Sequence, residues 1–254
     1  DDDGQAYLYW GNPNVYYAKL NADMVSLDGE VSKVEQTIES FGSPGPDKRE
    51  KGKKYKDIYT EGPWLHKRGG TYYLSYAAGG VPEHIAYSMS DTPTGPWKYM
   101  GEIMPLQDTG SFTNHCGVTD YKGNSYFFYH TGKLPGGGGF GRSVAVEQFS
   151  YNPDGTFPII NATTEGVSPV GTLTPYQRVE AETIAFSEGV KSEWNAKTGV
   201  YVSGIHDGDY IKVREVDFED LSPKCLCVSV ASALRGGWIE IRTDSIGGTL
   251  IAEM

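Results

Sequence analysis

Aromatic and polar positions repeat one pattern three times along the chain. Each copy has a glycine, two variable residues, a tyrosine, a leucine or phenylalanine, another variable residue and a second large aromatic residue. The copies occupy residues 4–10, 70–76 and 123–129. Large aromatic side chains suit a pleated, half-buried surface, and glycine suits the turn before it. Each copy therefore predicts the turn and second strand of a β-hairpin.

Further strands and turns are predicted around these hairpins. Residues 142–149 predict a strand, which a turn at residues 151–156 follows, and residues 90–97 predict another turn. The polar, weakly periodic segment 24–41 predicts a loop that contains a strand. Hairpins separated by long loops suit the four-stranded blades of a β-propeller. An all-β fold with part of a propeller is therefore expected over residues 1–165.

The pattern changes after a segment with the composition of a linker, residues 166–175. The region 176–254 opens with a strand at residues 179–182. It continues with alternating apolar and polar positions in four further segments, residues 200–202, 210–213, 225–231 and 238–242. Alternation with period two indicates strands with one buried face. We expect a β-sandwich (jelly-roll) module that is incomplete, because residue 254 falls within a predicted strand.

Composition supports this fold and excludes several classes of partner. The 33 glycines, 14 prolines and 18 tyrosines suit many short strands joined by turns. The net charge of −11 disfavours nucleic acid and anionic membranes, because phosphate binding needs clustered cations. The basic segment 48–54 is interpreted as a solvated loop rather than a binding patch. No apolar run approaches the roughly 18 residues of a membrane span.

Two other sequence features argue against a cofactor or a disulfide framework. The four glycines at residues 136–139 lack the lysine, the serine or threonine and the helix that would follow in a phosphate-binding loop. No organic cofactor is therefore expected. The three cysteines, Cys116, Cys225 and Cys227, are odd in number and form no recognisable disulfide or metal-binding motif.

Candidate chemistry lies in the strands that precede the repeated turns. Glu61 is nine residues before the glycine of the second copy, and the same step back from the third glycine reaches Asn114, beside His115. The innermost strands of propeller blades line the central channel, so these residues are expected to converge there. Hydrolysis of a glycosidic bond needs an acid that protonates the leaving oxygen. Glu61 is the candidate acid, the alternative being a surface glutamate in a turn, and Trp64 is a candidate wall for a sugar ring.

Four segments, residues 1–11, 61–67, 95–97 and 141–143, together resemble glycoside hydrolase family 43 over residues 1–165. The resemblance implies a five-bladed β-propeller and hydrolysis with inversion at the anomeric carbon. It implies that Glu61 is the general acid and that Arg142 contacts substrate. It also implies that His115 helps to hold a calcium ion or a water at the propeller axis. Arg142 could instead form a salt bridge at a strand end, and His115 could be a hydrogen-bonded core residue. The remaining expected substrate contacts in this region are Trp10, Trp64 and Phe112.

The chain departs from the pattern of family 43 in its carboxylates. The resemblance implies two further aspartates, a general base and a residue that tunes the acid, and both belong upstream of Asp1. The aspartates at positions 1–3 are interpreted as the hairpin turn and not as replacements. We therefore expect an internal fragment of a longer enzyme, with the C-terminal blades of the propeller only.

The last part of the chain resembles carbohydrate-binding module family 6. The likeness rests on residues 180–182, 208–211, 229–232 and 239–244. It implies a structural calcium ion bound partly by Glu180 and Glu182, which share one face if the segment is a strand. Tyr210 is either a stacking platform for a sugar or an ordinary core tyrosine of the sandwich.

These inferences predict a hydrolase of plant cell-wall arabinoxylan or xylo-oligosaccharides. It would be an exo-acting α-L-arabinofuranosidase or β-xylosidase that releases L-arabinofuranose or D-xylose. Such an enzyme is expected to be secreted or periplasmic, with calcium as the candidate metal and with neither nucleic acid nor membrane as a partner. The alternative is a carbohydrate-binding protein without catalysis, which would keep the aromatic residues and Arg142 as sugar contacts.

Overall fold

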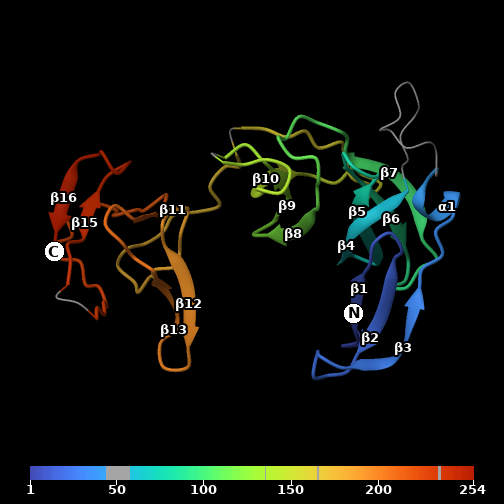
Figure 1. The fold of residues 1–254 in the computed structure, drawn as a ribbon, viewed down its shortest axis with the longest axis horizontal. Helices are drawn as coiled ribbons and strands as arrows, with labels where there is room; N and C mark the ends of the chain where they lie inside the picture. Colours follow the sequence, from blue (N-terminus) through green and yellow to red (C-terminus); the bar gives the residue numbers. More distant parts are fainter. Residues whose placement is uncertain (44–57, 135, 165, 234–235) are drawn as a thin grey trace. The chain divides into compact units, whose positions relative to one another are not determined.

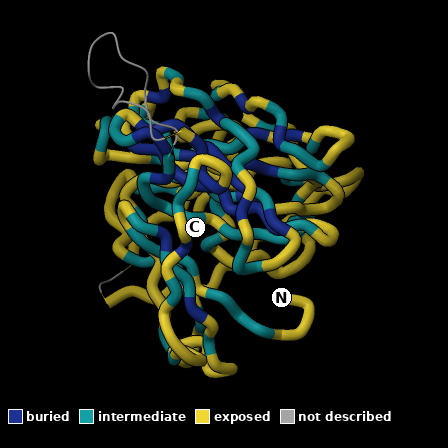
Figure 2. The backbone as a smooth tube through the Cα atoms, turned by 90° about the vertical axis from the view of Figure 1, so that its right-hand side faces the viewer, coloured by how far each residue is buried: buried dark blue, intermediate teal, exposed yellow. Residues whose placement is uncertain are grey.

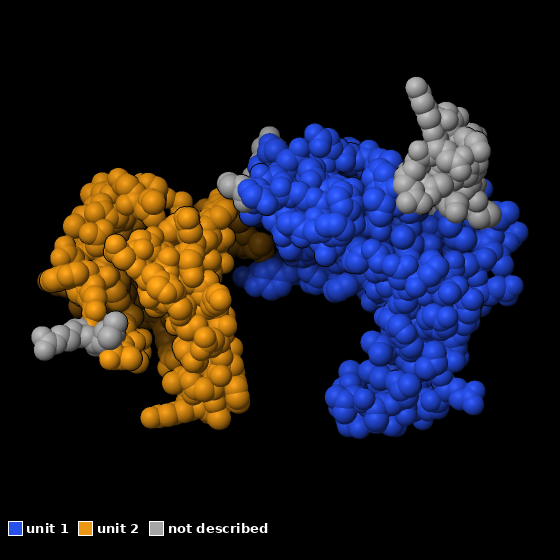
Figure 3. All heavy atoms as spheres, in the orientation of Figure 1, with its two compact units in different colours: residues 1–168 blue, residues 169–254 orange. Residues whose placement is uncertain are grey.

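The computed structural model describes residues 1–43, 58–134, 136–164, 166–233 and 236–254. The predicted basic loop at 48–54 lies outside the described residues. Within them, strands dominate and the helix α1(Ile38–Phe41) spans a single turn, so the all-β expectation is confirmed. The contacts divide the chain into unit 1, residues 1–168, and unit 2, residues 169–254, coloured separately in Figure 3. The division falls inside the segment predicted as a linker.

Unit 1 contains the three predicted hairpin repeats as parts of antiparallel sheets (Figure 1). The first sheet has the order β1(Ala6–Trp10), β2(Tyr16–Leu20), β3(Leu27–Lys33). The second is a four-stranded blade, β4(Tyr59–Arg68), β5(Thr71–Ala78), β6(His84–Ser90), β7(Lys98–Met104). The third has the order β8(Gly117–Tyr121), β9(Asn124–Thr131), β10(Ser143–Phe149). The repeats supply β1, β5 and β9, each directly after its glycine turn, as the aromatic pattern predicts.

Two hydrophobic clusters join these sheets. One combines residues of the second sheet with Val15, Val34 and Phe41, from the first sheet's turns and α1. The other combines residues of the second sheet with residues of the third sheet, such as Val118 and Phe127. Most buried residues belong to these two clusters. Figure 2 shows the buried residues along the backbone in dark blue. The sheets of unit 1 are therefore held by packing of their faces, as neighbouring blades are.

The segment 151–164, which we call the strap, ties the third sheet to the second. Its Ile160 N–H donates to the carbonyl of Ile103 at 2.7 Å. The buried carboxylate of Glu147 on β10 accepts hydrogen bonds from the backbone N–H and the hydroxyl of Thr163 in the strap. A buried carboxylate needs such donors, so Glu147 fixes the end of the strap.

Unit 2 consists of short paired strands. These are β11(Phe186–Glu188) with β14(Tyr210–Lys212), β12(Lys191–Asn195) with β13(Gly199–Ser203), and β15(Glu240–Arg242) with β16(Leu250–Glu253). Two predicted strands are wrong. Residues 225–231 form no strand, and the segment 180–183 is a turn closed by a hydrogen bond from the Thr183 N–H to the Glu180 carbonyl. Apolar alternation alone does not make a strand, because each strand needs a hydrogen-bonding neighbour.

Candidate active site

Glu61 lies where the pairing of β4 with β5 is irregular. The register shifts on both sides of Glu61, between Tyr59 and Glu61 and between Glu61 and Trp64. Gly62 has φ +63°, a left-handed backbone conformation that residues with a side chain rarely adopt. The Glu-Gly-Pro sequence thus interrupts the regular pleat, and the Glu61 side chain is left 28 % exposed.

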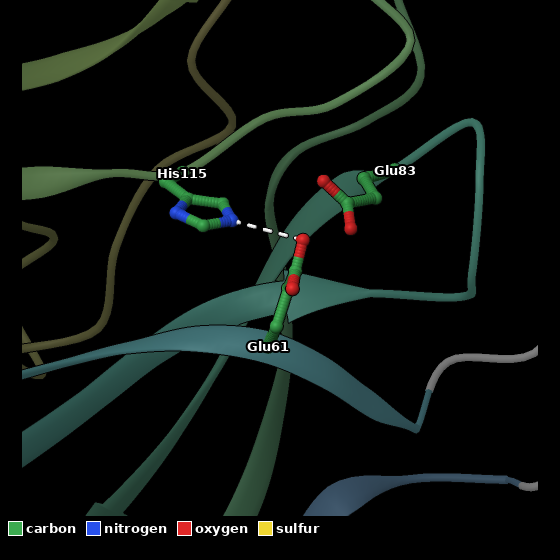
Figure 4. Close-up of side chains that lie close together, drawn as sticks. All are labelled: Glu61, Glu83 and His115. Carbon is green, nitrogen blue, oxygen red and sulfur yellow. Dashed lines mark hydrogen bonds and ion pairs between the residues drawn. The ribbon is translucent and has the colours of Figure 1, made fainter. Parts of the chain in front are cut away.

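Two side chains from other parts of unit 1 hold the Glu61 carboxylate. His115 Nε2 lies 3.2 Å from Oε1, the contact drawn as a dashed line in Figure 4. The Asn12 amide donates from Nδ2 to Oε2 at 2.5 Å. Each carboxylate oxygen therefore has its own partner. The predicted meeting of Glu61 with His115 is confirmed, although His115 and Asn114 lie just before β8 rather than on it.

Glu83, which the sequence analysis missed, organises the segment that carries His115. Its carboxylate Oε2 accepts the backbone N–H of Asn114 at 2.7 Å, and its own N–H donates to the carbonyl of Phe112 at 3.0 Å. Glu83 is 5 % exposed. Its side chain points toward Glu61 and His115 (Figure 4). One donor atom of each of these three residues lies within 4.8 Å of the others.

The neighbouring His130 is a neutral support for His115. The two rings stack with centroids 5.2 Å apart, and His130 Nδ1 accepts the His115 backbone N–H at 3.3 Å. Burial, with smaller effects from His115 and Arg142, lowers the pKa of His130 to about 4. His130 therefore stays uncharged at neutral pH and can accept this hydrogen bond.

The other predicted substrate contacts of unit 1 are exposed or half-buried. Trp64 and Phe112 are 42 % and 39 % exposed. Arg142 donates from Nη1 to the hydroxyl of Thr113 at 3.4 Å. Arg142 thus contacts the residue that directly follows Phe112. The Phe112 ring meets that of Phe140 edge to face. Trp10 ends β1 and stacks on Tyr16.

The predicted site residues of unit 2 are placed as follows. Tyr210 is half-buried in β14 opposite Glu188, and Glu180 forms an ion pair with Arg178 at 2.9 Å. Because residues 180–183 form a turn, Glu180 and Glu182 do not share the face of a strand. Their role as calcium ligands stays a prediction.

The donor set around His115 has a composition that a hard cation accepts. Glu61 and Glu83 would add carboxylate oxygens to the imidazole, and oxygen ligands are what calcium prefers. Glu61, however, is already engaged by His115 and Asn12. A calcium ion at the propeller axis therefore also stays a prediction.

Comparison with known proteins assigns this region to a family. The family model described as "Glycosyl hydrolases family 43" matches residues 1–157. The chain belongs to this family. A second model, "Carbohydrate binding module (family 6)", matches residues 180–254. Both resemblances stated from the motifs are confirmed, and Glu61, His115 and Asn12 lie within the family 43 region.

Two relatives that match the whole chain share one description. An arabinoxylan arabinofuranohydrolase of Bacillus subtilis is 32 % identical over 100 % of this chain and 52 % of its own length. A protein of the same description from Paenibacillus polymyxa is 31 % identical over 100 % of this chain and 42 % of its own length. The chain thus spans about half the length of these relatives.

A solved structure of family 43 also matches the whole chain. The crystal structure of a glycoside hydrolase family 43 arabinoxylan arabinofuranohydrolase from Bacillus subtilis, in complex with cellotetraose, matches with a TM-score of 0.69. It is 29 % identical and covers 100 % of this chain and 55 % of its own. In the described parts of the present chain, no helix is long and apolar enough to cross a membrane.

Proposed function

We propose that this chain is part of an inverting, exo-acting hydrolase that removes L-arabinofuranose from arabinoxylan, with Glu61 as its general acid. The observation that carries the proposal is the Glu61 carboxylate in the family 43 region. It is 28 % exposed and has a separate partner on each oxygen, Asn12 and His115. A carboxyl group that is held in one orientation and still reachable from solvent suits proton transfer to a bound sugar.

The reaction follows from the requirements of inversion. Glu61 gives its proton to the glycosidic oxygen as the bond from that oxygen to the anomeric carbon breaks. A water attacks the opposite face of the sugar and passes a proton to a second carboxylate, the general base. We propose that an aspartate on a segment upstream of Asp1 supplies this base. Glu83 is unsuited to the role, because it is buried and bonded to the backbone of Asn114.

The choice of sugar rests on the relatives. Those that match the whole chain are described as arabinoxylan arabinofuranohydrolases. A protein described as a beta-xylosidase, from Xylanibacter ruminicola, matches 61 % of this chain at 26 % identity. We therefore propose L-arabinofuranose as the product, with D-xylose as the alternative. Plant cell-wall arabinoxylan as substrate and secretion or export to the periplasm belong to the same proposal.

The remaining contacts are assigned within the proposal. Trp10, Trp64, Phe112 and Arg142 would contact the substrate in unit 1, and Tyr210 would stack on a sugar in unit 2. Calcium would bind near His115 and, in unit 2, at Glu180 and Glu182. Titration of chelator-treated protein with calcium, followed by calorimetry, tests these metal sites; no heat at millimolar calcium would remove them.

Replacement of the acid tests the proposed reaction. In the protein encoded by the whole gene, Glu61→Gln should lower turnover of arabinoxylan by about 10²- to 10⁴-fold, the usual contribution of a general acid. Release of arabinose is followed by chromatography. Glu39→Gln, a change in the exposed first turn of α1, is the control and should keep wild-type turnover. Undiminished turnover in Glu61→Gln would remove Glu61 from the reaction.

A binding protein without catalysis is the second candidate. An observation in the described part of the chain supports it: the carboxylate grouped with Glu61 and His115 is that of Glu83, which is buried and unsuited to act as the base. Isothermal titration with xylo-oligosaccharides separates the two candidates. Binding by a whole-gene product that releases no sugar would support the second, and sugar release that depends on Glu61 would exclude it.

A further inference from the structure

We propose that Asn12 is a positioning residue for the general acid, which determines the oxygen of Glu61 that carries the proton. This inference rests on the proposed function of Glu61. Asn12 lies in the turn between β1 and β2, and Glu61 lies on β4 of the next sheet. The Asn12 amide reaches across and donates to Oε2 at 2.5 Å.

The turn that carries Asn12 is held from both ends. The Tyr59 hydroxyl donates to the carbonyl of Gly11 at 2.5 Å, and the Gln36 side chain donates to the carbonyl of Pro13 at 3.1 Å. At the end of the turn, the Val34 N–H donates to the carbonyl of Val15 at 2.9 Å. The backbone on either side of Asn12 is therefore tied down, although its side chain is exposed.

Gly11 makes the tight course of this turn possible. It has φ +126°, and a Cβ at this position would lie 1.9 Å from the carbonyl oxygen of Asn14. A side chain there would collide with the backbone of the turn. The adjacent Trp10 also stacks on Tyr16 across the base of the turn.

Tyr59, which holds the turn, and the proposed acid Glu61 lie on the same strand, β4. Tyr59 is two residues before Glu61 on β4, and burial raises the pKa of the Tyr59 hydroxyl, with a smaller effect from the charge of Glu61. The hydroxyl therefore stays a donor to Gly11 throughout the neutral range. One strand thus carries the acid and also holds the turn that positions it.

The chemistry of the amide decides the place of the proton. An amide N–H can only donate, and it donates best to a carboxyl oxygen that bears no hydrogen. The contact with Asn12 therefore keeps Oε2 as the acceptor oxygen in the protonated acid. The transferable proton is placed on Oε1, 3.2 Å from His115 Nε2, and this assigns to Nε2 the role of acceptor in the protonated acid. Asn12 also fixes the rotation of the carboxyl group, which proton transfer to the leaving oxygen requires.

Leaving groups of different basicity test this role. A nitrophenolate leaves from 4-nitrophenyl arabinofuranoside without protonation, whereas a sugar alkoxide must be protonated as it leaves. Asn12→Ala in the whole-gene product should lower kcat on arabinoxylan oligosaccharides by about tenfold or more. On the nitrophenyl substrate, kcat should fall less than about threefold, and KM should change little on either substrate.

Two further variants separate the loss of the Asn12 N–H donor from a general disturbance of the turn. Asn12→Asp keeps the shape of the side chain but, when ionised, has no N–H to donate, so it should show the same split between substrates. Asn14→Ala makes the same change two residues later in the turn and should match the wild type. Thermal unfolding midpoints of all variants should agree within about 2 °C, because the Asn12 side chain is exposed.

The outcomes separate the inference from the proposed function. Equal losses on both substrates, or no loss in either Asn12 variant, would overturn the role of Asn12 while leaving that of Glu61. Failure of Glu61→Gln to impair turnover of the oligosaccharides would overturn the proposed function itself, whatever the Asn12 variants do.

Discussion

At the scale of single residues, the proposed acid depends on a glycine beside it. A Cβ at Gly62 would lie 2.8 Å from Cγ of His115, closer than real Cβ atoms approach. The His115 ring occupies the space where a side chain would be, and from there it reaches Oε1 of Glu61. Position 62 thus requires glycine for two reasons: its φ is left-handed, and the His115 ring fills the space that a side chain would occupy.

We expect Gly62→Ala to impair catalysis more than stability. The new methyl group should push His115 away from Glu61, and a displacement of about 1 Å at a reacting group can lower turnover by about 10²-fold. Turnover of arabinoxylan and the unfolding midpoint of the whole-gene product are the measurements. Gly70→Ala is the matched control, because a Cβ there meets no atom within 4 Å. Equal turnover in the two variants would show that the His115 position is not critical.

The sequence predicts Glu61 as the candidate acid but does not predict all of the residues that contact it. A count back from the repeated turns reaches Glu61 and Asn114, and His115 is the neighbour of Asn114. Asn12 and Glu83 belong to no such repeat. Their contacts join residues 49 and 31 positions apart and depend on the docking of a turn and of a strand start. Side-chain contacts of this kind appear only once the sheets are packed.

At the scale of elements, β4 is anchored by a half-buried histidine as well as by its backbone hydrogen bonds to β5. The His66 ring stacks on Tyr73 with centroids 4.8 Å apart, and Nε2 lies 2.9 Å from the Tyr151 hydroxyl in the strap. Burial is the main cause that lowers the pKa of His66 to about 4, below the ordinary value of 6.5. The strand, its neighbour β5 and the strap therefore meet at an uncharged imidazole.

This histidine predicts acid sensitivity of unit 1. Between pH 6.5 and about 4, the unfolded chain binds a proton at His66 and the folded chain does not. The free energy of unfolding should therefore fall as the pH falls through this window, by about 3 kcal/mol for His66. Urea unfolding at several pH values measures the slope. His66→Gln should reduce the slope but not abolish it, because the pKa of His130 is lowered in the same way. An unchanged slope would contradict the assignment to His66.

The elements show where sequence patterns suffice. In unit 1, aromatic repeats and glycine turns predict β1, β5 and β9, because local turn chemistry and side-chain burial agree there. In unit 2, the alternating segment 225–231 forms no strand. Leu226, Val228 and Val230 are all exposed, so the face that the alternation would bury has no cover among the described residues. The alternation of apolar and polar residues indicates which face of a strand would be buried. It does not supply the neighbouring strand or the packing partner that a strand needs.

At the scale of the whole molecule, burial is distributed unevenly between the units. The buried residues lie in unit 1, with β5 almost wholly enclosed, whereas no described residue of unit 2 is buried. Unit 2 nevertheless matches the family 6 module over residues 180–254. The two units therefore differ in the apolar packing that opposes local opening.

Hydrogen exchange of this 254-residue chain should reflect that difference. Amides of β5 should exchange most slowly, since their release requires both hydrophobic clusters to open, and amides of β12 and β13 should exchange orders of magnitude faster. Mass spectrometry of the exchanged, digested chain measures both. Similar protection in β5 and β12 would contradict the expected order.

The contact between Asn12 and Glu61 spans two sheets, and this has a consequence for heat inactivation. A small slide of the first sheet against the second would separate the amide from the carboxylate while every strand stayed paired. Proton transfer by Glu61 would therefore depend on the relative position of the two sheets. On warming, activity toward oligosaccharides should fade several degrees below the loss of β-sheet circular dichroism, so the enzyme would stop working while it still looked folded.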